Sequence, residues 1–160
     1  MRFLGYLFLF ALVAFGVWPY YQIFRLDDAL GKDDMATLQQ LVDVDAIRRN
    51  YKERVEDGLG IQPQAQDPGS ALAWLQQNLQ RLGDAALEQT ITPEWVRDTL
   101  REAAAGATDR QPPYFMAGVT FACFESYDSF IIRLGELGRN ATHVRMRLED
   151  KAWRVTDIIR

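Results

Sequence analysis

Few residues of this 160-residue chain have the type and spacing that catalysis needs. His143 is the only histidine and Cys123 the only cysteine. The sequence has no glycine-rich phosphate loop, no Ser/His/Asp or Cys/His set and no spaced group of metal ligands. It therefore predicts no catalytic residue, no cofactor and no metal site.

The chemistry-bearing residues that remain have simple structural interpretations. Cys123 lies in an apolar run, which predicts a small buried hydrophobe rather than a reactive thiol, and a lone cysteine cannot form an internal disulfide. His143 is expected on the outer side of a strand, where an exposed histidine is a simpler interpretation than a general base. Asp43 is interpreted as a helix cap, and Asp157 as a turn or strand-edge residue.

Basic side chains near the C-terminal end form the one candidate binding site. Alternation along the predicted strands places them opposite the apolar residues, on an open face of the sheet. Two interpretations stay open: cross-strand pairing with Glu136 and Glu149, or binding of an anionic lipid headgroup or an acidic partner. This basic stripe consists of Arg133, Arg145, Arg147 and Arg154.

The stripe requires a sheet, and the pattern after Pro112-Pro113 predicts one. Apolar residues there recur with a period of two, which is typical of strands. Tight turns between the strands make neighbours antiparallel, with one face buried under helices and the other at least partly exposed. The predicted strands cover about 114–125, 129–135, 142–149 and 152–159, with turns at 126–128, 138–140 and 150–151.

The preceding part, residues 20–106, shows helical spacing instead. Pro19 is predicted to begin a new helix or to kink a longer one, and Gly31 to end it. Further helices are expected after Asp34, after Asp43 or Asp45, after Ser70 and at Thr92-Pro93, with a loop at residues 58–69. The charged residues between 48 and 54 are interpreted as a solvated helix face. Helices followed by an antiparallel sheet define an α+β fold.

Residues 3–24 contain no ionisable side chain except tyrosines. A helix over them would reach about 33 Å, close to the thickness of a bilayer's hydrocarbon core. Trp18, Tyr20 and Tyr21 suit an aromatic belt at the membrane surface. A cleaved signal peptide and a buried core helix are the alternatives, but Ala14-Phe15-Gly16 is a poor cleavage site. We expect an uncleaved anchor of residues 1–24.

Charge predicts the orientation of this anchor. Arg2 and the terminal amine lie on one side, whereas Arg25 on the other side is followed by four aspartates before residue 35. Because positive charge stays in the cytoplasm, we expect a cytoplasmic N-terminus, and residues 25–160 as one domain on the far side of the inner membrane, the periplasm of a bacterium. The formal charge of -4 argues against general nucleic-acid binding.

Two sets of residues carry a resemblance to a known family. They are Leu26-Asp27-Asp28-Ala29-Leu30, Asp33-Asp34, Leu38, Leu41-Val42-Asp43 and Ile47-Arg48, then Phe124 to Phe130 and Trp153 to Ile158. They resemble a bacterial family catalogued as a domain of unknown function, number 2939, whose members begin with a hydrophobic anchor. The resemblance covers both ends of the domain, leaves residues 59–107 unmatched and carries no catalytic residues. It implies a membrane-anchored envelope protein without an assigned activity.

A broader similarity is to cone-shaped α+β folds of the nuclear-transport-factor-2 and cystatin-like kind. It is similarity of fold alone. Such folds often hold an apolar pocket between helices and sheet, and some use an acid and a histidine there as an isomerase or dehydratase.

Together these observations predict a non-enzymatic, single-pass inner-membrane protein whose periplasmic domain binds a partner protein or an apolar ligand. A membrane-anchored pocket enzyme of the isomerase or hydratase type is one alternative. An accessory subunit held to a larger membrane complex through residues 3–24 is another. A deep pocket lined by ionisable residues would favour the enzyme, whereas a core filled by Trp, Phe and Leu would favour the other two.

Overall fold

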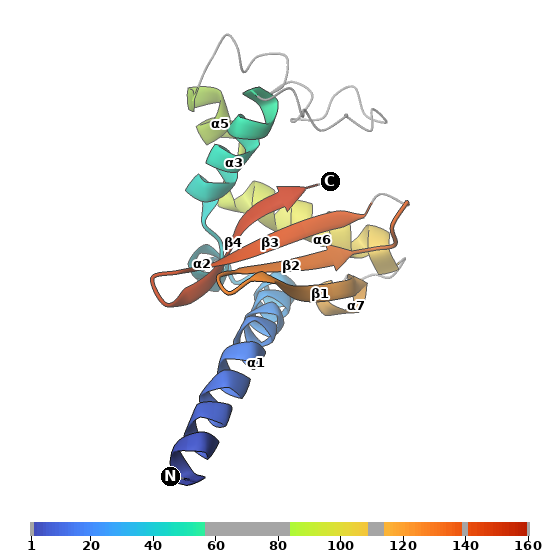
Figure 1. The fold of residues 1–160 in the computed structure, drawn as a ribbon. Helices are drawn as coiled ribbons and strands as arrows, with labels where there is room; N and C mark the ends of the chain where they lie inside the picture. The colour runs from blue at the N-terminus through green and yellow to red at the C-terminus, as the bar shows by residue number, and fades with distance from the viewer. Residues whose placement is uncertain (1, 57–83, 109–113, 139–140, 160) are drawn as a thin grey trace.

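The computed structural model describes residues 2–56, 84–108, 114–138 and 141–159 (Figure 1). The predicted loop at 58–69, the helix after Ser70 and the boundary at Pro112-Pro113 lie outside these residues, as does most of the turn at 138–140. In chain order the elements are α1 (Arg2–Lys32), α2 (Met35–Leu41), α3 (Val44–Glu56), α5 (Asp84–Thr90), α6 (Pro93–Thr108), α7 (Phe115–Gly118), β1 (Val119–Ser126), β2 (Ser129–Leu134), β3 (Thr142–Glu149) and β4 (Ala152–Ile159).

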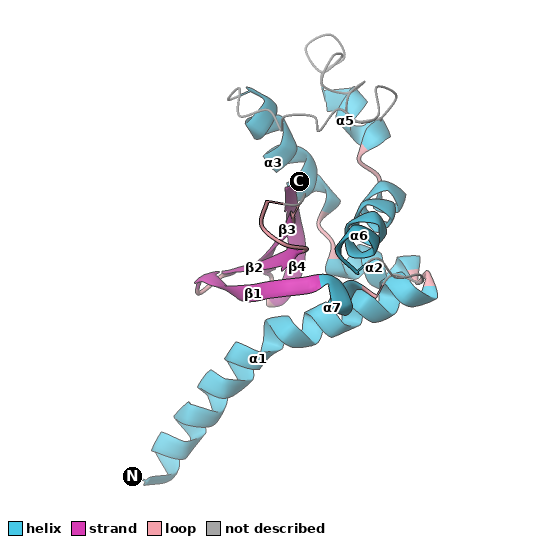
Figure 2. Cartoon of the chain, turned by 90° about the vertical axis from the view of Figure 1, so that its right-hand side faces the viewer, coloured by secondary structure: helices cyan, strands magenta, loops and turns pink. Residues whose placement is uncertain are grey.

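The four strands form one antiparallel sheet in the order β1-β2-β3-β4. The α+β prediction, with helices first and the sheet last, is confirmed. β3 and β4 have the predicted bounds, because the turn at Asp150-Lys151 separates the two strands; side chains alternate along most of β3, whereas a register shift between Val155 and Asp157 interrupts the alternation of β4. Figure 2 shows α2, α6 and α7 on one side of the sheet and α1 beneath it, while the opposite side is open.

The prediction that the first strand begins near residue 114 is wrong, because residues 115–118 form α7. Contacts with distant elements hold this turn of helix. The Met116 backbone N–H donates to Asp27 Oδ1 of α1 at 3.2 Å. Gly118 packs so closely on α6 that a Cβ there would lie 3.1 Å from the Ala107 Cβ. Neither contact can be recognised from the residues around 115–118, and the local pattern of apolar residues there predicts a strand.

The core lies between the inner face of the sheet and the helices. As predicted, the apolar residues of β3 face inward: Val144 and Met146 are fully buried, while Arg145 and Arg147 of the same strand face outward. The largest fully buried side chains include Trp153, Phe115 and Phe130. Tilted and edge-on contacts between rings 5–6 Å apart are a favourable geometry, and the Phe124–Phe130 centroids lie 5.0 Å apart.

Side-chain caps fix where the helices begin. Asp34 accepts from the Thr37 N–H at 3.1 Å, and Thr92 Oγ1 accepts from the Trp95 N–H at 3.2 Å, as predicted. Of the two candidates for α3, Asp43 is the cap, because its Oδ1 accepts from the Ala46 N–H at 2.8 Å. Asp45 lies inside the helix. The Asp43 N–H also donates to Val155 O at 2.9 Å, which joins the start of α3 to β4.

Helix α1 is continuous and carries Pro19 in its interior. The alternative of a kink within a longer helix is therefore the correct one, and Figure 2 shows the helix bending along its length. Its first half is exposed, with Phe3 at 89% and Phe10 at 75%. Its second half enters the core, where Leu26 is fully buried. The helix ends at Lys32, one residue after the predicted stop at Gly31.

By length and composition α1 could cross a membrane, a property that a signal sequence shares. It passes the predicted anchor boundary at residue 24 without a break. Residues on both sides of that boundary, Ile23 and Leu26 among them, belong to one hydrophobic core.

Candidate functional site

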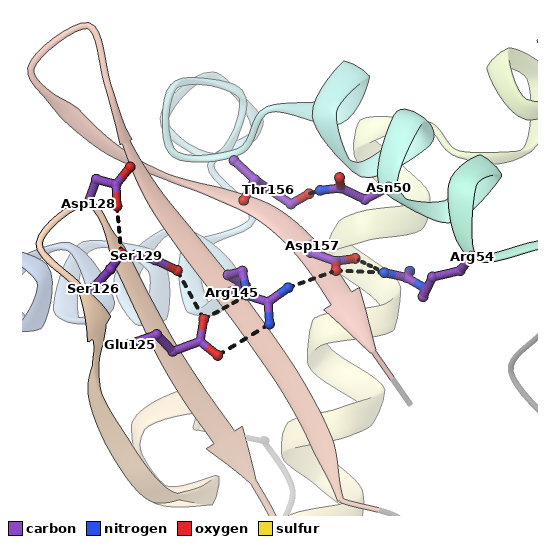
Figure 3. A network of polar contacts seen from close by, with 9 residues as sticks. All are labelled: Asn50, Arg54, Glu125, Ser126, Asp128, Ser129, Arg145, Thr156 and Asp157. Atoms are coloured by element: carbon purple, nitrogen blue, oxygen red, sulfur yellow. Dashed lines mark hydrogen bonds and ion pairs between the residues drawn. The ribbon is translucent and has the colours of Figure 1, made fainter. Parts of the chain in front are cut away.

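The open face of the sheet holds a polar network centred on Arg145 of β3 (Figure 3). Its guanidinium donates from Nε to Glu125 Oε2 at 2.8 Å and from Nη2 to Glu125 Oε1 at 3.3 Å. The same carboxylate accepts from Ser129 Oγ at 3.0 Å. On its other side, Arg145 Nη1 lies 3.6 Å from Asp157 Oδ2. Arg145 therefore bridges two carboxylates from the two edge strands.

Asp157 is the most buried member of this network, with its side chain 3% exposed. Arg54 of α3 reaches it across the edge of the sheet, with Nη1 at 2.5 and 2.6 Å from the two carboxylate oxygens. One turn earlier on α3, Asn50 Nδ2 donates to Thr156 O at 2.8 Å. Because Arg54 and Asn50 bond to β4, this side of α3 packs against the sheet. The prediction that the charged residues of α3 form a solvated face therefore does not hold for Arg54.

The sequence prediction missed Arg54 and placed Asp157 only at a turn or strand edge. The one available signal was the four-residue spacing of Asn50 and Arg54, which puts both polar side chains on one side of a helix. That spacing does not say which carboxylate, 103 positions along the chain, they meet.

The positive and negative charges of this network balance each other. The hydrogen bond from Arg145 lowers the pKa of the Glu125 carboxyl, and the hydroxyl of Ser129 adds to this effect. Reciprocally, the hydrogen bond to Glu125 raises the pKa of Arg145. Arg54 and Arg145 are thus matched by Asp157 and Glu125, so this part of the basic stripe has little net charge to offer a ligand.

The other stripe residues are differently placed. Arg147 of β3 is exposed and lies directly opposite Arg154 of β4. Within the described parts of the chain no ion pair joins either guanidinium to a carboxylate, and Arg154 Nε lacks a hydrogen-bond partner. Arg133 of β2 lies over the Phe121 ring, 5.2 Å from its centroid, and its Nε donates to Thr120 Oγ1 at 3.2 Å. Like charges directly opposite each other are unfavourable unless an anion lies between them.

Glu149, which the sequence suggested as a pairing partner, has a different neighbour. Burial and a hydrogen bond with Asp43 raise the pKa of the Glu149 carboxyl, and the charges of Arg154 and Arg49 act in the opposite direction. The end of β3 and the cap of α3 therefore form a carboxyl pair beside the stripe. The acid that binds Arg145 is Glu125, not Glu149.

The remaining single residues lie on the same open face. His143 lies opposite Arg133 and points away from the core as predicted, but it is half-buried rather than exposed. Cys123 is half-buried, so the prediction that it is buried is wrong. The alternation of β1 turns its neighbours Ala122 and Phe124 toward the core and therefore turns Cys123 outward.

A shallow cavity of about 250 Å³ lies between α3 and α5. It is lined by Asp45, Arg48, Arg49, Lys52, Leu87 and Glu88. Arg48 has a structural role there, because its Nε donates to Ile91 O at 3.0 Å. The similarity to nuclear-transport-factor-2 and cystatin-like folds implied an apolar pocket between helices and sheet. That similarity is unconfirmed, and large side chains such as Trp153 and Phe115 occupy the described interior.

Neither the curated proteins nor the solved structures contain a match to this chain. One family matches, described as "Protein of unknown function (DUF2939)", over residues 8–99. The match includes most of α1, the helices after it and the start of α6, and it ends before the sheet. It covers more than half of the 160 residues, including part of the stretch that the sequence motifs had left unmatched. The chain therefore belongs to this family of unknown function.

Proposed function

We propose that this protein is a single-pass inner-membrane protein whose domain, on the periplasmic side, binds an acidic partner protein without catalysing a reaction. The observation that carries the proposal is α1, whose first half projects from the domain with Phe3, Leu7 and Phe10 exposed. Exposed apolar area of this extent on a helix long enough to span a bilayer is unfavourable in water and favourable in lipid.

The charges around α1 support the orientation. Asp28, Asp33 and Asp34 are exposed where the helix ends in the domain. The opposite end carries Arg2. This distribution favours a cytoplasmic N-terminus.

The open face of the sheet supports the binding role. Arg147 and Arg154 lie opposite each other, and Arg133 lies two strands from β4 on the same face. Carboxylates of a partner would relieve the repulsion between Arg147 and Arg154. The filled interior favours a surface, rather than a pocket, as the binding site.

Membrane insertion is tested by washing membranes at high salt and alkaline pH, with protease added to intact and to opened spheroplasts. We expect the full-length chain to stay in the membrane and its domain to be cleaved in intact spheroplasts. A soluble protein beginning near Val17 would overturn the anchor, and cleavage only after opening would overturn the orientation.

The binding role is tested by purifying the full-length protein in mild detergent with its bound proteins. Arg147→Gln combined with Arg154→Gln should release a partner that the parent retains. The matched control, Lys32→Gln with Arg97→Gln, removes the same charge near the end of α1 and should retain it. Equal retention by both double variants would exclude the stripe as the binding surface.

A further inference from the structure

The second half of α1 is buried on one side only. Ile23, Leu26 and Leu30 point into the core and are at most 3% exposed. On the opposite side Val17, Tyr21 and Phe24 are exposed at 56%, 57% and 57%. Steps of four and three residues keep these three side chains on one side of the helix. We call Val17, Tyr21 and Phe24 the outer stripe.

The outer stripe continues the exposed apolar surface of the first half, since Phe10 and Val13 precede it at the same spacing. It ends abruptly. One turn after Phe24 the same side of the helix carries Asp28, which forms an ion pair with Lys32 at 2.8 Å. An apolar surface that stops at a charged turn is typical of a helix leaving the membrane.

The domain covers the other side of the helix over the same length. Tyr20 Oη donates to Ala122 O of β1 at 3.2 Å, and the Phe15 and Phe124 rings stack with centroids 6.0 Å apart. β1 and α7 therefore run beside α1, and within the described chain the outer stripe is the most exposed apolar part of this half of the helix, with Trp18 at 37% and Tyr20 at 46% exposed beside it.

The length of the free part of α1 indicates what covers this stripe. The part of α1 before Phe15, which is free on all sides, would span only about 20 Å, well short of the roughly 30 Å hydrocarbon core. A bilayer that receives this helix therefore has to extend along α1 beyond Phe15. The outer stripe, flanked by the partly exposed Trp18 and Tyr20, offers it an apolar surface there, and Tyr21 has the amphipathic ring that suits the headgroup level.

We infer that phospholipid covers the outer stripe, so that the domain rests against the membrane along α1, with protein on one side of the helix and lipid on the other. This inference rests on the proposed membrane anchoring. It adds a second zone of lipid contact, inside the folded domain, to the free half of α1.

The inference is tested with spin labels on the full-length protein in phosphatidylglycerol and phosphatidylethanolamine vesicles. The single cysteine makes this simple, because Cys123→Ser provides a background without thiols. Labels are placed by Leu9→Cys in the free half, Phe24→Cys and Val17→Cys in the outer stripe, and Glu53→Cys on α3, at the far end of the molecule in Figures 1 and 2. Collision with oxygen, which concentrates in lipid, is compared with collision with a water-soluble nickel chelate.

We expect the oxygen-to-nickel ratio to be highest at Leu9, several-fold above the Glu53 value at Val17 and Phe24, and lowest at Glu53. A water-exposed label at Leu9 would overturn the proposed anchoring itself. Lipid exposure at Leu9 with the Glu53 ratio at both stripe positions would overturn only this inference. Shielding of both stripe positions from both reagents, with disulfide-linked dimers of the Phe24→Cys chain, would also overturn it, because a second copy would then cover the stripe.

Discussion

At the scale of single residues, the ion pair between Arg54 and Asp157 stands out because the carboxylate is nearly inaccessible to water. Arg54→Gln would leave Asp157 with Arg145 at 3.6 Å as its remaining charged partner. Removing one member of a buried pair is costly, so we expect a loss of roughly 3 kcal/mol in the free energy of unfolding. Urea unfolding in detergent followed by circular dichroism measures it.

The control for this prediction is Arg147→Gln, which removes the same charge from an exposed position of the same face. It should change the free energy of unfolding by less than about 0.5 kcal/mol. Equal losses in the two variants would show that the Arg54–Asp157 pair does not stabilise the fold.

Arg145 and Arg147 are two residues apart and look equivalent in the sequence, but the structure separates their roles. We expect Arg145→Gln to lower the free energy of unfolding by about 1 kcal/mol at pH 7, because the Glu125 carboxylate loses its charged donor and keeps only the Ser129 hydroxyl. The pKa of Glu125 is lowered in the fold, so this stability is present above its ordinary value of 4.5 and is lost as pH falls through the folded pKa. The difference between parent and variant should therefore shrink in acid. If the difference in the free energy of unfolding between parent and variant stayed constant down to pH 3, the proposed role of the Arg145–Glu125 interaction would be contradicted.

Glu149 should show the opposite pH dependence. Because burial raises its pKa in the fold, the folded state binds the proton more tightly, and stability falls as pH rises from 4.5 through the raised value. Glu149→Gln removes that charge while keeping a group that can hydrogen-bond to Asp43. We expect it to raise the melting temperature at pH 7 and to have little effect near pH 4. A melting temperature lowered equally at both values would contradict the carboxyl pair.

At the scale of elements, the two sides of α1 make a matched test. Leu26 is fully buried and Phe24 is 57% exposed, two positions apart on the same helix. Leu26→Ala should cost about 2–5 kcal/mol, whereas Phe24→Ala should change stability in detergent by less than about 0.5 kcal/mol. Thermal unfolding of the two purified variants measures the difference. Similar losses would mean that Phe24 packs against protein.

The sequence predicted those elements whose pattern is local. Alternation located β3 to the residue, the turn before Ala152 located the start of β4, and the caps Asp34 and Thr92 located the starts of α2 and α6. It failed at α7, where Asp27 and the close contact of Gly118 with Ala107 decide the conformation. Alternation also placed the basic stripe on the open face. It could not show which arginines of the stripe are paired with carboxylates. That depends on residues far apart in the sequence, such as Arg54 of α3, which binds Asp157 of β4.

At the scale of the whole molecule, the predicted division at residue 24 has a measurable consequence. A fragment that begins at Arg25 lacks the buried Gln22 and Ile23 and the ring contacts of Phe15 and Tyr20. We expect it to unfold at a lower temperature than a fragment that begins at Ala14, by circular dichroism in mild detergent. Identical melting curves would show that the domain folds without this part of α1.

The unbroken passage of α1 into the core also sets how the protein can search for a partner. A domain on a flexible tether turns freely and reaches as far as its linker allows. Here the bond between Tyr20 and Ala122 and the stacking of Phe15 on Phe124 fix the sheet to the helix. With α1 in the proposed membrane-spanning position, the arginine face would keep one height and one tilt above the bilayer, and the domain would turn only about the membrane normal and diffuse sideways. The proposed acidic partner would then have to present its carboxylates at that height, which favours a partner that is itself confined to the same membrane.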